Sequence, residues 1–145
     1  TTVLLASCFD LPANVRCIIA DCGFTSPYAI AKSVLRRDCP KLPVGLLLPL
    51  CSAFTKIFAG FGLHDASTLD AVRESKYPIL FIHGTGDTFV PCEMTKQAST
   101  ACTSPKELIL VPGAEHGKSY LAQPNRVKAA LKRFLDTYTN KEKAL

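Results

Sequence analysis

The sequence predicts an α/β fold, with a short parallel sheet of about three strands flanked by helices. Three short apolar runs, rich in Ile, Leu and Val, are continuous rather than alternating, which is typical of strands covered by helices on both faces. Helical patterns separate and follow these runs, and such alternation favours parallel strands. A chain of 145 residues is long enough for one modest domain.

The predicted strands comprise residues 16–20, 78–82 and 107–111. Each ends in residues typical of turns: Asp-Cys-Gly after the first strand, His-Gly-Thr-Gly-Asp after the second and Pro-Gly-Ala-Glu-His after the third. Loops at the carboxyl ends of these strands are therefore the place to look for chemistry.

The helix that closes the chain has the clearest pattern. Its apolar residues recur at helical spacing and form a single stripe, and Pro124 suits the first turn. The stripe consists of Val127, Ala130, Leu131, Phe134, Leu135 and Tyr138. Three further helices are predicted: one over residues 27–37, one over residues 68–76 capped by Ser67 or Thr68, and one that begins at Pro91. The last of these directs Met94, Ala98, Ala101 and Cys102 inward.

Residues 42–63 form an insertion between the first two predicted strands. Residues 42–55 carry no charge, but Pro43, Gly45 and Pro49 interrupt them, and they are too short for a membrane span. The insertion is interpreted as a cap-like apolar segment. Two alternatives are that it covers the sheet as part of the core, or that it contacts a membrane surface.

Composition is that of a packed protein, because 48% of the residues are hydrophobic and only 20% are charged. The net charge of +5 is mild, and the basic residues near the C-terminus (Lys128, Lys132, Arg133, Lys141 and Lys143) lack interleaved aromatic residues. We therefore expect a solvated face there and no nucleic-acid binding. No basic leader precedes the apolar start, so no signal peptide is expected.

Seven cysteines, with no Cys-x-x-Cys pair, argue against a zinc site or a disulfide scaffold. Most are interpreted as small buried residues, and this usage favours a reducing, cytoplasmic setting. Neither a metal nor a cofactor is expected.

Two residues suited to acid–base chemistry follow the predicted strands. Asp87 lies in H-G-T-G-D-T-F-V-P after residues 78–82, and His116 lies in P-G-A-E-H-G after residues 107–111. Because the two loops are adjacent at one edge of the sheet, we expect the side chains to touch. A carboxylate that orients an imidazole is what a hydroxyl nucleophile needs, so Asp87 and His116 are the candidate catalytic pair.

Other reactive residues have plainer interpretations. Asp21, after the first strand, is the rival for the catalytic acid, although it also suits a capping role in its loop. His83 is interpreted as a packed structural residue, and His64 as a surface or lid residue. Glu115 points away from the site if its loop is extended. Cys22 ends a strand and is an alternative as a reactive thiol, but no imidazole neighbours it in sequence.

The paired segments H-G-T-G-D-T-F-V-P and G-A-E-H-G resemble the acid and histidine segments of α/β-hydrolase-fold serine hydrolases. The similarity is greatest to bacterial esterase/lipase/peptidase-like members that have H-G-x-x-D-x-x-V-P. The stretch D-C-G-F-T-S-P at residues 21–27 resembles the loop after the preceding strand of that family. The resemblance covers nearly the whole chain and is weakest in residues 42–63. It implies Asp87 as the triad acid and His116 as the general base.

The family places its nucleophile on a Gly-x-Ser-x-Gly elbow, and no serine of this chain has those flanking glycines. Residues 1–8 resemble the small apolar helix that follows the elbow. The resemblance therefore implies a C-terminal part of a longer hydrolase, with its serine about three to five residues before Thr1. The chain alone is expected to be inactive.

The intact parent is expected to hydrolyse ester or related acyl bonds in a small apolar substrate. Without its preceding neighbour, the strand at residues 16–20 is expected to expose an apolar edge that pairs with the N-terminal portion of the same protein or with a second copy. Two alternatives stay open: a non-catalytic binding or scaffold protein of the hydrolase fold, and a doubly wound nucleotide-binding domain. The second is disfavoured, since no G-x-G-x-x-G or phosphate-loop motif is present.

Overall fold

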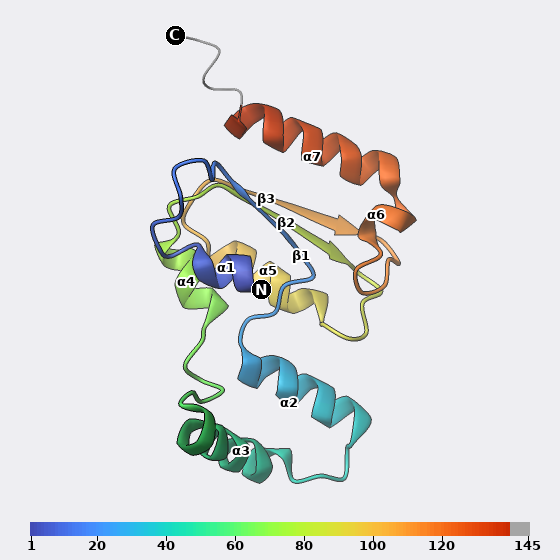
Figure 1. The fold of residues 1–145 in the computed structure, drawn as a ribbon. Helices are drawn as coiled ribbons and strands as arrows, with labels where there is room; N and C mark the ends of the chain where they lie inside the picture. Colours follow the sequence, from blue (N-terminus) through green and yellow to red (C-terminus); the bar gives the residue numbers. More distant parts are fainter. Residues whose placement is uncertain (140–145) are drawn as a thin grey trace.

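A computed structural model describes residues 1–139, so Lys141 and Lys143 of the expected basic tail lie outside the described residues. A parallel sheet forms the centre of the molecule, with strand order β1-β2-β3 (Figure 1). Its strands are β1 (Ile18–Asp21), β2 (Ile79–Gly84) and β3 (Lys106–Val111). The α/β class, the three strands and their parallel order, all predicted from sequence, are confirmed.

Helices cover both faces of the sheet (Figure 1). On one face lie α1 (Thr2–Ala6), α4 (Thr68–Glu74) and α5 (Cys92–Ala101), and on the other lies α7 (Pro124–Thr139). The short helix α6 (Ser119–Ala122) leads into α7 and contacts β2. Alternate residues of β2 serve the two layers, which is why its sequence is apolar throughout.

Two apolar clusters hold these layers together. Phe81 packs between α1, α4 and α5, with Leu4, Val72 and Ala98 from those helices. On the other face, Leu80, Ile82, Ile109 and Val111 pack against α7 through Val127, Ala130 and Phe134. The predicted stripe of α7 is thus the buried one, except that Leu135, at its margin, is 37% exposed. Burial of whole aromatic and aliphatic side chains supplies most of the stabilisation of such a fold.

Helices α2 (Pro27–Asp38) and α3 (Val44–Ala59) lie apart from the sheet and pack against each other (Figure 1). Ser26 caps α2 by accepting a hydrogen bond from the amide of Ala29, and Pro27 occupies the first turn. Asp21 therefore does not cap this helix; it is the last residue of β1.

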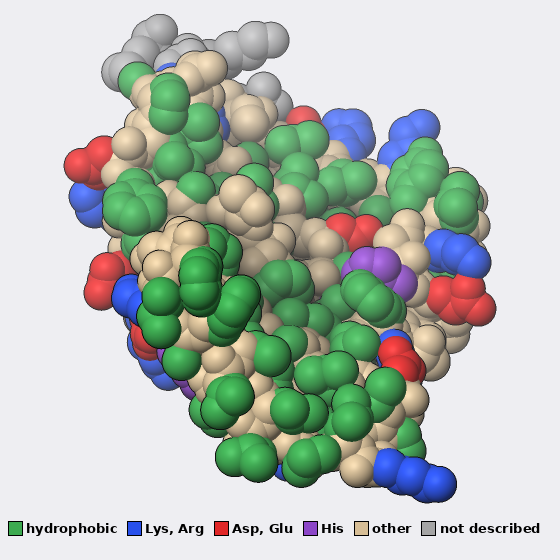
Figure 2. Space-filling view, turned by 60° about the horizontal axis from the view of Figure 1, so that its bottom comes forward, with side chains coloured by type: hydrophobic (Ala, Val, Ile, Leu, Met, Phe, Trp, Pro, Cys, Tyr) green, Lys and Arg blue, Asp and Glu red, His purple; other side chains and the backbone are tan. Residues whose placement is uncertain are grey.

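The alternative that the insertion covers the sheet as part of the core is wrong, because α3 lies away from the sheet. It contacts α2 and buries only Val44 and Leu48, although it contains Pro49 in its interior. Leu47 is partly buried, and the other large apolar side chains of the helix are exposed: Leu46, Leu50, Phe54, Ile57 and Phe58, followed by Phe61. Figure 2 shows hydrophobic side chains gathered on the face of the molecule formed by these helices. No helix within residues 1–139 combines the length and apolarity needed to cross a bilayer.

Strand β1 is an edge strand within the described residues, since it pairs with β2 alone. Ile18 and Ala20 are buried, whereas Ile19 is 39% exposed. Helix α1 contacts the strand from one face but supplies no strand to pair with its free edge. The expected apolar edge is therefore present within the described residues.

Candidate active site

The candidate site lies at the carboxyl ends of the three strands. Asp87 follows β2 in a turn that is closed by a hydrogen bond from its own amide to the carbonyl of Gly84. His116 lies in the loop after β3. Its Nδ1 is 2.7 Å from Oδ2 of Asp87, so the two residues predicted to form a pair lie in direct contact.

The carboxylate of Asp87 is surrounded by donors. Its Oδ1 accepts hydrogen bonds from the amides of Phe89 (2.9 Å) and Val90 (2.8 Å), while Oδ2 faces His116. Burial opposes ionisation, but the Val90 amide, the His116 imidazole and the Phe89 amide together lower the pKa of Asp87 below its ordinary value. Asp87 is therefore an anion at neutral pH and is held in one orientation.

Contacts between neighbouring loops fix the position of His116. The amide of Gly86 donates to the carbonyl of Ala114 (3.0 Å), and the amide of Gly113 donates to the hydroxyl of Thr85 (2.9 Å). On the other side of His116, the amide of Gly117 donates to Sγ of Cys22 (3.3 Å). Glycine suits positions 113 and 117 because both have positive φ, at 70° and 65°.

The imidazole of His116 is buried at one end and open at the other. Its Nδ1 contacts the fully buried side chain of Asp87, yet 45% of the His116 side chain is exposed, and Phe89 packs against the ring edge-on. Nε2 has no hydrogen-bond partner within residues 1–139. With Nδ1–H donated to a carboxylate, Nε2 is the lone-pair nitrogen, so the arrangement suits a base that accepts a proton from a group outside the described residues.

The rival acid lies elsewhere. Oδ1 of Asp21 accepts from Sγ of Cys22 (3.2 Å) and from the hydroxyl of Ser119 (3.4 Å), and no contact joins Asp21 to His116. Asp87, rather than Asp21, has the geometry of an acid that orients His116.

Cys22 is a poor nucleophile in this setting. Burial, together with nearby Asp21 and Asp87, raises the pKa of its thiol to about 12, against the opposing effect of the Gly117 amide. The thiol therefore stays protonated at neutral pH. Its backbone has φ of 54°, which is unusual for a residue other than glycine.

The other two histidines have contrasting environments. His64 stacks on Tyr28 with ring centroids 4.0 Å apart, in the segment between α3 and α4 and away from the Asp87–His116 contact. His83 is fully buried and lies beside Asp87, with its Nε2 3.2 Å from Oδ2 of that residue. The sequence predicted His83 to be a packed structural residue, and this contact was missed. A signal was present in the spacing, because His83 and Asp87 are four residues apart across a turn that contains two glycines. Glu115 pairs with Lys118 and does not contact His116.

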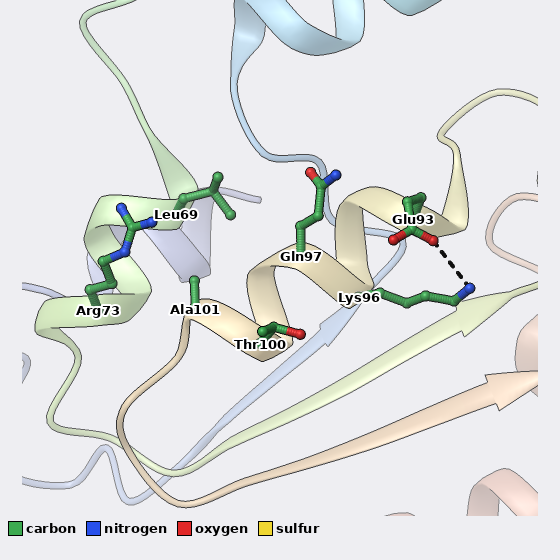
Figure 3. A pocket seen from close by; sticks show the side chains of 7 residues that line it. All are labelled: Leu69, Arg73, Glu93, Lys96, Gln97, Thr100 and Ala101. Atoms are coloured by element: carbon green, nitrogen blue, oxygen red, sulfur yellow. Dashed lines mark ion pairs between the residues drawn. The ribbon is translucent and has the colours of Figure 1, made fainter.

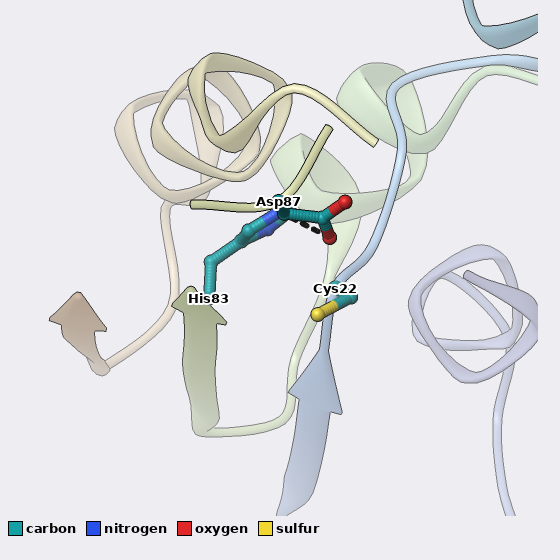
Figure 4. Close-up of side chains that lie close together, drawn as sticks. All are labelled: Cys22, His83 and Asp87. Atoms are coloured by element: carbon teal, nitrogen blue, oxygen red, sulfur yellow. Dashed lines mark ion pairs between the residues drawn. The ribbon is translucent and has the colours of Figure 1, made fainter. Parts of the chain in front are cut away.

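Cys22, His83 and Asp87 place one potential ligand atom each within 4.8 Å of one another (Figure 4). Each of these groups already has a partner outside the trio. Cys22 Sγ contacts Asp21 and the Gly117 amide, His83 Nε2 faces the carbonyl of Val90, and the two oxygens of Asp87 accept from backbone amides and from His116.

A separate hollow lies between α4 and α5, where Leu69 and Arg73 face Gln97 and Ala101 (Figure 3). The Glu93–Lys96 ion pair on α5 borders it, with 3.2 Å between Nζ and Oε2. Neither Asp87 nor His116 lines it. This hollow therefore has no part in the candidate site.

Comparison with known proteins gives a family match and several related structures. The family model of TAP-like proteins, an α/β-hydrolase family, matches residues 62–144. The uncharacterized protein YqkD of Bacillus subtilis (strain 168) is 30% identical over 118 residues, which cover 81% of this chain and 38% of YqkD.

Two solved structures support the same fold. The esterase Pf2001 of Pyrococcus furiosus has a TM-score of 0.61 at 21% identity, over 87% of this chain and 46% of that protein. The acylaminoacyl peptidase of Pyrococcus horikoshii has a TM-score of 0.58 at 16% identity, over 93% of this chain and 22% of the peptidase. The chain thus spans less than half the length of each of these relatives.

Proposed function

The chain belongs to the TAP-like family of α/β-hydrolases, and on that premise we propose that it is the C-terminal part of a serine hydrolase that cleaves ester or related acyl bonds. The observation that carries the proposal is the 2.7 Å contact between Nδ1 of His116 and Oδ2 of Asp87. The chain would supply the acid and the histidine of a triad, and a segment of the whole protein outside this sequence would supply the serine.

In the proposed mechanism, the serine Oγ attacks the carbonyl carbon of the substrate while Nε2 of His116 takes the hydroxyl proton. Asp87 holds the Nδ1–H tautomer and stabilises the imidazolium that forms. His116 then returns the proton to the leaving oxygen or nitrogen, and a water molecule repeats the sequence to release the acid. Backbone amides outside this chain, one of them just after the serine, would bind the oxyanion.

The substrate class we propose is an ester with an apolar acyl group. The support is the exposed apolar face of α3, where Phe54 and Phe58 are 60% and 73% exposed and lie against each other. Single exposed apolar residues are ordinary, but a contiguous set on one helix is typical of a binding surface. A cap of this kind would stabilise a bound acyl chain by removing its surface from water.

The experiment that tests this function uses the whole protein and a fluorescent alkyl fluorophosphonate, which modifies activated serines. We expect labelling of one serine, faster with a long alkyl chain than with an ethyl group, and slowed at least 100-fold by His116→Ala because the base is lost. Labelling that is absent, or that is unchanged in the variant, contradicts the proposal. Absence would favour the alternative of a non-catalytic binding protein.

We also propose that the free edge of β1 is paired in the whole protein by a strand from its N-terminal portion. The buried, apolar Ile18 and Ala20 beside an edge without a strand support this placement. The 145-residue chain alone should then self-associate, and sedimentation velocity should show dimers or larger species at micromolar concentration. Ile19→Lys, which puts a charge on the edge strand, should shift the chain to a monomer. If the unsubstituted 145-residue chain is a monomer at the same concentration, this proposal is contradicted.

The cysteines support a reducing, cytoplasmic location as a further part of the proposal. All seven are free, and two of them, Cys39 and Cys51, are exposed. Exposed thiols persist more readily in a reducing compartment than in an oxidising one.

A further inference from the structure

His83 is fully buried, and its two ring nitrogens both contact polar groups. Nδ1 lies 2.6 Å from the hydroxyl of Thr95 on α5. Nε2 lies 3.0 Å from the carbonyl oxygen of Val90 and 3.2 Å from Oδ2 of Asp87. Figure 4 shows the imidazole and the carboxylate side by side above Cys22. A buried imidazole with every nitrogen engaged has a fixed orientation.

These contacts determine where the ring carries a proton. Both neighbours of Nε2, the carbonyl of Val90 and the carboxylate of Asp87, are acceptors, so Nε2 is an N–H donor. At the other nitrogen, the hydroxyl of Thr95 lies 2.6 Å from Nδ1 and donates its own proton to the carbonyl of Gly23 (3.0 Å). The Nε2–H is therefore directed at the carbonyl of Val90, and Oδ2 of Asp87 lies beside it at 3.2 Å in an electrostatic contact.

The two contacts of Nε2 act on the same turn. The carbonyl of Val90 accepts a hydrogen bond from His83, and the amide of Val90 donates a hydrogen bond to Oδ1 of Asp87. Oδ2 of Asp87 accepts a hydrogen bond from His116. His83 therefore touches both the backbone that cradles the carboxylate and the oxygen that holds the candidate base.

We propose that His83 is a positioning residue for Asp87: its Nε2–H holds the Val90 carbonyl of the turn around the carboxylate and lies 3.2 Å from the Oδ2 that binds His116, and so governs how strongly Asp87 binds His116. The inference rests on the proposed function for its catalytic meaning, because only there does Asp87 orient a base. The partial positive charge of an N–H beside an acceptor oxygen weakens the hydrogen bond that this oxygen accepts from another group, so removing that N–H strengthens the bond.

The other titratable groups near His83 do not replace this interaction. Cys22, at the end of β1, keeps its proton and is turned toward Asp21, while α5 offers only the uncharged Thr95 at the imidazole. Coupling between His83 and His116 must therefore run through Asp87.

The first test uses NMR on the unmodified 145-residue chain with ¹⁵N-labelled histidine. The buried His83 Nε2–H resonance should move as the pH is changed, over the same pH range in which the ring resonances of His116 move. Asp87→Asn should abolish that coupling. A His83 resonance that stays constant while His116 titrates overturns the proposal, and this measurement needs no variant of His83.

The second test separates positioning from packing with two variants of similar size. His83→Gln places an N–H near the position of Nε2, whereas His83→Asn places one near Nδ1 and leaves no N–H beside Oδ2. We expect the His116 Nδ1–H resonance to move downfield in His83→Asn and to stay near its original position in His83→Gln. No change in either variant, or the same change in both, overturns the proposal.

The Asp87→Asn variant distinguishes a failure of the His83 proposal from a failure of the Asp87–His116 pair. If Asp87 binds His116, that variant removes the downfield Nδ1–H resonance of His116, whatever His83 does. Its persistence in Asp87→Asn would overturn the catalytic pair itself, whereas failure of the His83 variants alone would leave the pair standing.

Discussion

Asp87→Asn in the whole hydrolase is expected to lower the turnover of ester substrates by roughly 10³- to 10⁴-fold. The variant changes only one atom of the side chain. Its remaining Oδ1 stays fixed by the amides of Phe89 and Val90. The new amide group then faces Nδ1 of His116 and Nε2 of His83, so that donors meet donors. His116 is left in the wrong tautomer, with no lone pair at Nε2 for the serine proton.

The measurement is the kcat for a chromogenic ester at neutral pH, with KM determined in the same experiment. KM should change little, because Asp87 is buried and does not face the substrate. Glu115→Gln is the matched control. Like Asp87→Asn, it replaces one carboxylate with an amide, but Glu115, although next to His116 in sequence, pairs with Lys118. The control should retain its kcat within about twofold. If Asp87→Asn also retained its kcat within about twofold, Asp87 would have no role in the mechanism.

The class of the fold was readable from the sequence because the apolar runs of β2 and β3 are continuous. The end of β2 was less readable. The apolar run stops at Ile82, but the strand continues to Gly84 because His83 is paired with β3 and buried. Burial of an imidazole depends on partners such as Thr95 and Val90 that lie beyond the strand, and no local pattern reports them.

The candidate site was predictable in part for the same reason. Asp87 and His116 follow neighbouring parallel strands, and strand order alone brings their loops together. Cys22, which follows the distant strand β1, also contacts this region, and its contact with the Gly117 amide depends on three-dimensional packing. Helix α3 misleads in the opposite direction: its apolar composition indicates a buried element, yet the structure exposes most of it.

Gly84→Ala is expected to destabilise the chain by about 3 kcal/mol, at the upper end of the usual cost of overpacking. A Cβ at position 84 would lie 2.1 Å from the carbonyl oxygen of Ala114 and 2.6 Å from its carbonyl carbon. Both are backbone atoms, which cannot rotate away as a side chain can. The loop after β3 must therefore move, and the Gly86–Ala114 hydrogen bond that ties the two loops together lengthens.

The same displacement should separate Asp87 from His116, because each lies within three residues of the clash. Urea unfolding measures the stability, and the His116 Nδ1–H resonance measures the contact. Gly45→Ala is the control: nothing lies within 4 Å of its added Cβ, and inside α3 it should stabilise by about 0.5–1 kcal/mol. Equal stability of the two variants would mean that Gly84 and the carbonyl of Ala114 do not approach closely enough for an added Cβ to clash. An unfolding free energy that drops while the resonance persists would show that the pair is held by contacts other than those between the two loops.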